Sequence, residues 1–193
     1  MNIEKGLERG VLYIVATPIG NNDDMSSRAR EILIACDRVA AEDTRRAARL
    51  LAELGGNRHK LISFHEHNEH KLVDYVVGEL VMGASVALVS DSGTPLLSDP
   101  GYRLVKAASS YGISVRPIPG PSSIIAALSV CPLPAHPFCF VGFLPKKKKE
   151  LHSRLQELIK KTEAVVFFES PRRIRRTLSL LSTLTERKLF LIK

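Results

Sequence analysis

The chain has 193 residues, of which 45% are hydrophobic, so it is long enough to bury a core as one large or two small domains. It has no apolar run near the ~18–20 residues that a membrane span needs and no secretory signal pattern, so we expect neither a membrane protein nor a secreted one. Its three cysteines, Cys36, Cys131 and Cys139, are widely spaced and match no metal-ligand pattern, which indicates free thiols in a reducing, cytoplasmic setting.

The net charge of +8 is divided unevenly along the sequence. Residues 1–100 carry 11 Lys and Arg against 15 Asp and Glu, whereas residues 101–193 carry 17 against 5. This asymmetry predicts two domains and an anionic partner, such as a nucleic acid, for the second. A basic surface that only aids solubility is the alternative.

Short apolar runs rich in β-branched residues alternate with amphipathic stretches in the first half of the chain. Residues 1–10 are polar and predict a flexible start. The pattern after them predicts strands over 11–17, 39–41, 60–64, 85–90 and 113–118. The predicted helices run from a cap at Ser26 to Cys36, from a cap at Thr44 to Gly55, over 68–82 and over 101–111.

Three closely spaced prolines, Pro117, Pro119 and Pro121, indicate a boundary between an N-terminal domain (11–118) and a C-terminal domain (119–193). The second domain is predicted to hold helices over 122–130, over 150–161 and from Ser170-Pro171 onward, and strands over 138–143, 164–169 and 188–192. The alternation favours α/β layers. The final strand would leave an apolar edge, so we expect either pairing with another chain or a sequence shorter than its fold.

Polar or turn-forming segments follow four of the predicted strands, where open α/β sheets bind ligands. They are PIGNNDDMS (18–26), AAEDTR (40–45), SDSGTP (90–95) and PGPSS (119–123). The sequence contains neither GxGxxG nor GxxxxGK[ST], so a nucleotide held by a Rossmann turn or a P-loop is disfavoured. Asp91, directly after a buried strand, predicts either a ligand-binding carboxylate or an Asx-turn that closes its own loop.

Two further clusters carry charge or potential metal ligands. The segment FHEHNEH (64–70) places three histidines close together, but no second cluster completes a site, so we predict an exposed turn and no metal. The lysine run 146–149, expected on a loop, and the arginines near 172–176 are candidate phosphate contacts. A solvated basic face is the alternative reading.

Taken in order, seven segments resemble the tetrapyrrole methylase superfamily and, within it, the methyltransferases of small-subunit ribosomal RNA. The segments are LYIVATPIGN, AAEDTR, HEHNE, ALVSDSGTPLLSDPGYRLV, PIPGPSSIIAALS, FCFVGFLPKK and FFESPRRI. The resemblance implies an α/β, two-domain tetrapyrrole-methylase-like fold (class III SAM methyltransferase) with an incomplete second domain. It also implies S-adenosyl-L-methionine (SAM) in a cleft between domains, 2′-O-methylation of a cytidine in the decoding region of 16S rRNA in the small ribosomal subunit, and a homodimer.

The same resemblance assigns residues by motif. It implies cofactor contacts from Pro18, Val89, Ser90, Asp91, Thr94, Ser122 and Ser123, joined by Phe168 and Glu169 of the second domain. Glu42 and Asp43 are the carboxylates to test as general base or RNA positioner, although they could equally cap the helix near Thr44. The candidate RNA contacts are Arg45, Lys146, Lys147, Lys148, Lys149 and Arg172.

The sequence departs from the family pattern at Asn22, where an apolar residue is usual, at Ser92, where alanine is usual, and at Arg172, where histidine is usual. The family pattern also continues with further strands after the point where this sequence ends. We therefore expect lower SAM affinity and weak or absent activity, which isothermal titration tests. Two alternatives stay open: a tetrapyrrole methylase, and a non-catalytic fragment that binds RNA or dimerises.

Overall fold

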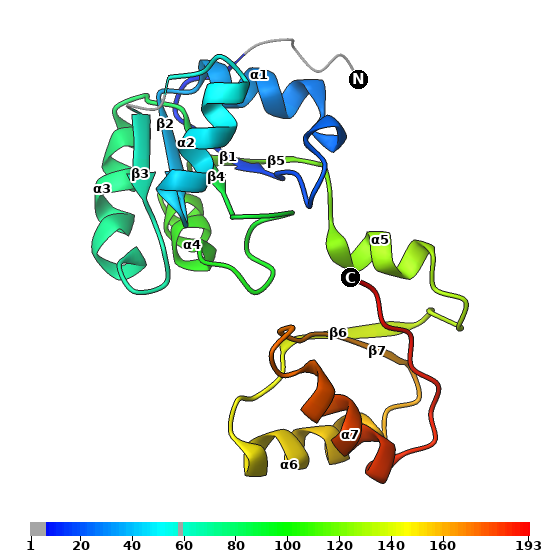
Figure 1. The fold of residues 1–193 in the computed structure, drawn as a ribbon. Coiled ribbons are helices and arrows are strands. Elements are labelled where there is room, and N and C mark those ends of the chain that lie inside the picture. The colour runs from blue at the N-terminus through cyan, green and yellow to red at the C-terminus, as the bar shows by residue number, and fades with distance from the viewer. Residues whose placement is uncertain (1–6, 58–59) are drawn as a thin grey trace. The chain divides into compact units, whose positions relative to one another are not determined.

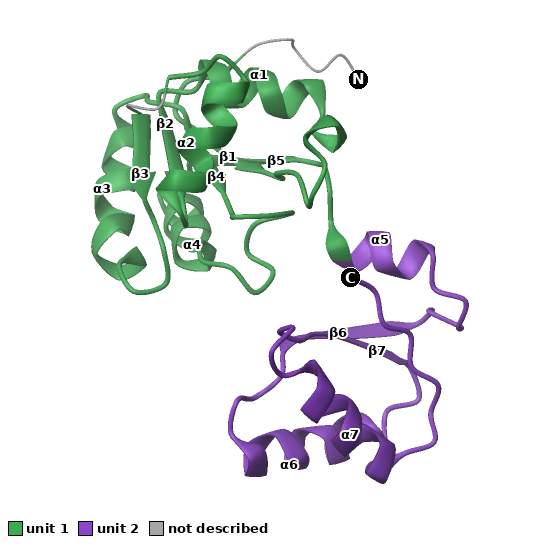
Figure 2. Ribbon diagram, in the orientation of Figure 1, with its two compact units in different colours: residues 1–123 green, residues 124–193 purple. Residues whose placement is uncertain are grey.

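The computed structural model describes residues 7–57 and 60–193, and the chain forms two compact units, unit 1 (Met1–Ser123) and unit 2 (Ile124–Lys193) (Figure 2). The predicted α/β class is confirmed. Within the described ranges, no helix is both long enough and apolar enough to cross a membrane.

Unit 1 is built on a parallel sheet with the strand order β3-β2-β4-β1-β5 in its described part. The strands are β1 (Val11–Val15), β2 (Arg38–Ala41), β3 (Leu61–Ser63), β4 (Val86–Val89) and β5 (Ser114–Ile118). Central β4 has the sequence VALV and every residue of it is buried, which is the pattern of a strand covered on both faces. The five strand predictions for this half are confirmed, with shorter bounds for four of them and with β2 beginning one residue earlier than predicted, at Arg38.

Helices cover both faces of this sheet (Figure 1). Helices α1 (Ser27–Ala35) and α2 (Thr44–Glu53) contribute to one buried cluster, and α3 (Glu69–Val81) and α4 (Tyr102–Ser110) contribute to the other. A short 3-10 helix, η1 (Asn22–Asp24), precedes α1. The predicted cap of α1 is confirmed, since Ser26 Oγ accepts the N–H of Ala29 at 3.1 Å.

Unit 2 begins within α5 (Ser123–Ser129) and contains a parallel pair of strands, β6 (Phe138–Phe143) and β7 (Ala164–Phe168). Helices α6 (Lys148–Leu158) and α7 (Ile174–Leu184) supply most of its core, which centres on Leu144, Leu151, Leu155 and Leu158. The β6–β7 register shifts between Phe140 and Phe143, where Gly142 adopts a positive φ of 68°. A bulge at glycine is the ordinary way to accommodate such a shift.

Three expectations for unit 2 are wrong. Residues 185–193 are not a strand: no ladder in unit 2 includes them, and Leu189 to Ile192 are 39–57% exposed. A strand forms only where another strand pairs with it, and composition does not supply that partner. Just before the predicted strand 188–192, Arg187 donates its guanidinium to the carbonyls of Lys161 and Glu163. The last helix starts at Ile174 rather than at Ser170-Pro171, and Lys148 and Lys149 lie in the first turn of α6 rather than on a loop.

From residue 7 onward, the start of the chain packs against the rest of unit 1. Leu7 contacts the core cluster of α1 and α2, and Glu8 pairs with Arg116 of β5. Residues 1–6 of the flexible start predicted over 1–10 lie outside the described residues.

Candidate functional site

The loops that follow the strands of unit 1 meet at one edge of the sheet, because parallel strands end on the same side. We call the loops 16–22, 42–43, 90–101 and 119–122 the carboxyl rim. Thr17 and Gly93 exchange two backbone hydrogen bonds, at 2.9 and 3.1 Å, which join the loops after β1 and β4. Thr94 Oγ1 donates to the carbonyl of Pro121 at 3.2 Å, which joins the loops after β4 and β5.

Asp91 ties the loop after β4 to the connection between β2 and α2. Its Oδ1 accepts the N–H of Asp43 at 3.0 Å, and its Oδ2 lies 3.5 Å from Arg46 Nη1. The carboxylate therefore holds a neighbouring loop in place, which neither the ligand nor the Asx-turn interpretation predicted. Its side chain is still 30% exposed, so it retains access to a ligand.

Glu42 lies among several negative charges at the same rim. Burial raises the pKa of Glu42 above its ordinary value, and the charges on Asp91 and Asp99 raise it further. Burial likewise raises the pKa of Asp99, to which Asp91 contributes. Carboxylates with these environments favour a cationic ligand and make Glu42 a better proton acceptor than an ordinary surface glutamate.

Asp43 and Arg45 form a pair at the start of α2. Asp43 is the N-cap, since its Oδ1 accepts the N–H of Arg45 at 2.9 Å. The predicted cap at Thr44 is therefore wrong, and the alternative that Asp43 caps this helix is confirmed. The guanidinium of Arg45 also donates to both carboxylate oxygens, at 3.0 and 2.8 Å, and these hydrogen bonds hold the pKa of Asp43 well below its usual range. Asp43 is therefore a weak base, while the Arg45 side chain remains 87% exposed.

Removal of the cap should loosen α2. We expect Asp43→Ala to lower the Tm of unit 1 by a few degrees, because loss of an N-cap leaves an N–H without a partner. Thr44→Ala, one residue away, should leave the Tm within about a degree. Thermal unfolding followed by tyrosine fluorescence measures both, and an equal loss in the two variants would contradict this assignment of the cap.

The other predicted cofactor residues of unit 1 lie on or beside the rim. Ser90 is buried and its Oγ donates to the carbonyl of Gly93 at 3.4 Å. Val89 ends β4, Pro18 follows the Thr17 bridge, Ser122 lies on the loop after β5, and Ser123 begins α5. A Cβ on Gly120 would lie 3.0 Å from Ala16 Cβ, so glycine permits the close approach of the loops after β5 and β1.

In unit 2, the predicted residues Phe168 and Glu169 have partners of their own. The ring of Phe168 lies 5.0 Å from that of Phe140. The Glu169 side chain is 3% exposed; its Oε1 lies 2.6 Å from Arg173 Nη2, and its Oε2 accepts the Thr177 hydroxyl at 2.7 Å. The Glu169 carboxylate thus binds within its own unit, which leaves the backbone of this residue for any cofactor contact.

Arg173 organises the basic segment of unit 2. In addition to Glu169, its Nη1 donates to the carbonyls of Leu144 and Pro145 at 3.1 and 3.2 Å, which fixes the loop that leads into Lys146–Lys149. The sequence prediction named the exposed neighbour Arg172 and missed this role. The four-residue spacing of Glu169 and Arg173 at a helix start is the signal that could have indicated it.

The lysines themselves surround the start of α6. Lys147 is its N-cap residue and lies 3.1 Å from Glu150, while Lys146, Lys148 and Lys149 are exposed. Positive side chains at the positive end of a helix dipole oppose folding slightly and strengthen the local attraction for anions.

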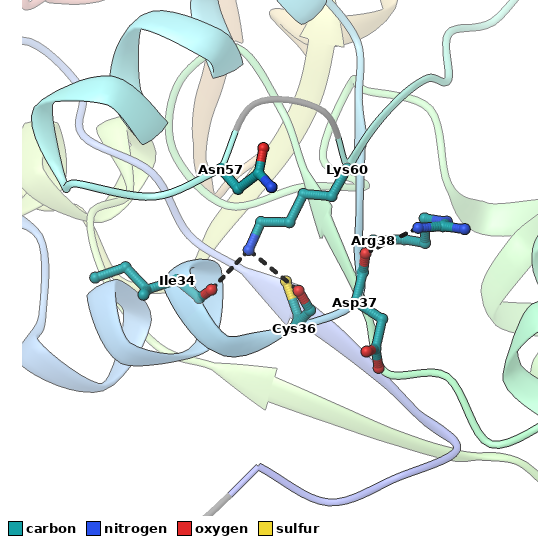
Figure 3. Close-up of a pocket in the computed structure, with 6 residues that line it drawn as sticks. All are labelled: Ile34, Cys36, Asp37, Arg38, Asn57 and Lys60. Atoms are coloured by element: carbon teal, nitrogen blue, oxygen red, sulfur yellow. Dashed lines mark hydrogen bonds between the residues drawn. The ribbon is translucent and has the colours of Figure 1, made fainter.

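A pocket of about 370 Å³ lies at the opposite, amino edge of the unit 1 sheet, where β2 begins (Figure 3). Lys60 Nζ donates there to the carbonyls of Leu33, Ile34 and Cys36, the orphan carbonyls at the end of α1. The Lys60 side chain thus satisfies carbonyls at the end of α1, whose C-cap residue is Cys36, and the pocket lies away from the rim.

The segment FHEHNEH forms the turn between β3 and α3. Within the ranges 7–57 and 60–193, no group of three or more His, Cys, Asp and Glu side chains is arranged to hold a metal ion. His65 Nδ1 is buried and has no hydrogen-bond partner among the described atoms.

This parallel sheet, whose carboxyl rim carries carboxylates and closely packed small residues, defines an α/β domain of the kind that binds ligands at the carboxyl ends of its strands. The chain belongs to the tetrapyrrole (corrin/porphyrin) methylase family, whose model matches residues 11–193.

The chain is similar to curated proteins named ribosomal RNA small subunit methyltransferase I. It is 49% identical to that of Xylella fastidiosa (strain Temecula1) over 91% of the chain and 64% of the relative, and 50% identical to that of Mesorhizobium japonicum over 86% and 56%. The relative from Escherichia coli O157:H7 is 45% identical over 86% and 58%. The chain thus spans about 56–64% of the length of these relatives.

Among solved structures, the chain is similar in fold to two structures of uroporphyrin-III-C-methyltransferase from Thermus thermophilus. One has a TM-score of 0.60 at 19% identity, over 89% of this chain and 76% of that chain; the other has 0.55 at 21%, over 77% and 74%. These likenesses support the fold assignment.

The rim residues fit SAM as a class of ligand. The sulfonium is a cation, and Glu42, Asp91 and Asp99 concentrate negative charge that raises the pKa of Glu42 and Asp99.

Proposed function

We propose that the protein is a SAM-dependent methyltransferase of small-subunit ribosomal RNA, acting in the cytoplasm on a cytidine 2′-hydroxyl in the decoding region of 16S rRNA. Family membership over residues 11–193, together with the high identity to relatives of that name, carries the proposal. The negatively charged rim and the basic segment of unit 2 support it by offering separate attractions for a sulfonium and for phosphates.

The residues divide by role in this proposal. The rim residues Pro18, Val89, Ser90, Asp91, Thr94, Ser122 and Ser123, with Phe168 and the backbone of Glu169, hold the cofactor. Arg45, Arg172 and Lys146, Lys147, Lys148 and Lys149 contact RNA phosphates. A homodimer is part of the same proposal.

SAM, when bound, supplies an electrophilic methyl group on a sulfonium. Transfer of that group to a ribose 2′-oxygen would require an acceptor for the hydroxyl proton. Glu42 is the acceptor we assign to this proton, because its raised pKa makes it a stronger base than Asp43.

Methyl transfer to isolated small subunits tests the function. Subunits from cells lacking the modification, with radiolabelled SAM, should acquire label in 16S rRNA at a single cytidine ribose, whereas protein-free 16S rRNA and a uroporphyrinogen should acquire little. Label in the tetrapyrrole and none in the subunits would contradict the proposal and favour the tetrapyrrole alternative. The Xylella relative, assayed alongside, establishes that the subunits are competent substrates.

A further inference from the structure

The loop 90–101, which carries Ser90, Asp91 and Thr94, has an unusual backbone. Gly93, Leu96, Ser98 and Gly101 all have positive φ angles, of 84°, 74°, 73° and 126°. Leucine and serine rarely adopt this region, and strained segments persist only where their surroundings hold them. The contacts at the two ends of the loop therefore determine its shape.

The upstream end of the loop is fixed by the rim itself, through the Thr17–Gly93 pair and the Thr94–Pro121 hydrogen bond. The downstream end is fixed from outside the rim. Glu69, the first residue of α3, accepts the N–H groups of Gly101 and Arg103 on its Oε1, at 3.2 and 3.0 Å. Glu69 is 8% exposed, and its carboxylate lies at the start of α4, where the helix dipole favours negative charge.

The position of Glu69 is set by the turn FHEHNEH. Asn68 Oδ1 accepts the N–H of His65 at 2.8 Å, Asn68 Nδ2 donates to the carbonyl of Ser63 at 2.8 Å, and the N–H of Glu69 donates to the carbonyl of His65 at 2.9 Å. The turn is thus a rigid support that presents one buried carboxylate to the loop.

Close packing adds a second constraint where the loop returns to α4. A Cβ on Gly101 would lie 2.5 Å from Leu88 Cδ2, so the backbone of Gly101 is pressed against β4. Leu88 is buried in the sheet and cannot move aside freely. Without the Glu69 carboxylate, the N–H groups of Gly101 and Arg103 would lose their partner at this packed position, and the loop would gain alternative conformations.

We propose that Glu69 is a positioning residue for SAM binding: it holds loop 90–101 in the conformation that presents Ser90, Asp91 and Thr94. This inference rests on the proposed function. Within residues 7–57 and 60–193, both hydrogen-bond partners of the Glu69 carboxylate are backbone N–H groups of the loop end and α4, so it acts through the loop.

Three variants of α3 test this role. Glu69→Ala removes the acceptor, Glu69→Gln keeps an oxygen at the same position, and Glu79→Ala removes a glutamate from the other end of the same helix, where Glu79 pairs with Arg38 at 2.9 Å. In Glu69→Ala, we expect the fraction of molecules whose loop has the binding-competent conformation to fall to about a tenth. The affinity for SAM, measured by isothermal titration, then falls about tenfold. Glu69→Gln should recover most of the affinity, and Glu79→Ala should match the unsubstituted chain even if its Tm falls.

Hydrogen exchange measured by mass spectrometry gives a readout that needs no cofactor. Glu69→Ala should speed amide exchange across residues 91–103, with no change at β1 or β2. A tenfold loss of SAM affinity in Glu79→Ala as well, or unchanged exchange in Glu69→Ala, would overturn the positioning role. If the unsubstituted chain takes up no SAM, the proposed function fails on its own, and the exchange result still decides whether Glu69 orders the loop.

Discussion

Glu42→Gln is expected to slow methyl transfer to small subunits by about a hundredfold or more, while SAM affinity changes less than about threefold. The amide keeps the shape of the side chain but cannot accept the ribose proton. The rate is measured at saturating SAM. Glu31→Gln, an exposed position on α1, is the control and should retain the full rate.

The pH dependence sharpens this prediction. A general base has to be deprotonated, so the rate should rise with pH through the raised pKa of Glu42 and then level off. Asp91→Asn removes one of the negative charges that raise this pKa, so the rising limb should move to lower pH. If Glu42→Gln keeps the full rate, or if the rate of Asp91→Asn rises over the same pH range as that of the unsubstituted chain, another group takes the proton.

Arg173→Ala is expected to destabilise unit 2 by about 3 kcal/mol, because it leaves the buried Glu169 carboxylate without its cation. The loop carbonyls of Leu144 and Pro145 lose their donor in the same variant. All four tyrosines lie in unit 1, so tyrosine fluorescence reports the unfolding of that unit alone. We expect that signal to be unchanged while hydrogen exchange over residues 138–184 becomes faster.

Arg172→Ala is the matched control for Arg173→Ala, because Arg172 is exposed and adjacent in sequence. It should leave the stability of unit 2 unchanged and weaken binding of 16S rRNA fragments, reducing the salt slope of the affinity by about one. Similar losses of stability in both variants would contradict the assignment of Arg173 to hydrogen bonds within unit 2 and of Arg172 to a phosphate contact.

The sequence predicted most of unit 1 because its signals are local. Short apolar runs rich in β-branched residues identify the strands, and the serine side chain at position 26 identifies the N-cap of α1. The same reasoning failed at 188–192, where an apolar, β-prone segment forms no ladder in unit 2. Strand formation depends on a partner that is distant in sequence, and composition does not report one.

The candidate site was predictable in its location but not in its internal contacts. The rule that ligands bind at the carboxyl ends of parallel strands brought together the loops of Pro18, Glu42, Asp91 and Ser122. Their hydrogen bonds depend on tertiary approach: the N–H of Asp43 on Asp91, and the carboxylate of Glu69 on Gly101, join residues 48 and 32 positions apart. The histidines of FHEHNEH drew attention as metal ligands, whereas the contacts that matter there come from Asn68 and Glu69.

Isothermal titration of the chain with SAM tests the central claim, that the carboxyl rim of unit 1 belongs to a SAM site, most directly. We predict saturable binding of one SAM per chain, weakened about tenfold or more in Asp91→Asn, which lacks one of the negative charges on the rim. Absence of saturable binding, or equal affinity in Asp91→Asn and the unsubstituted chain, would contradict it.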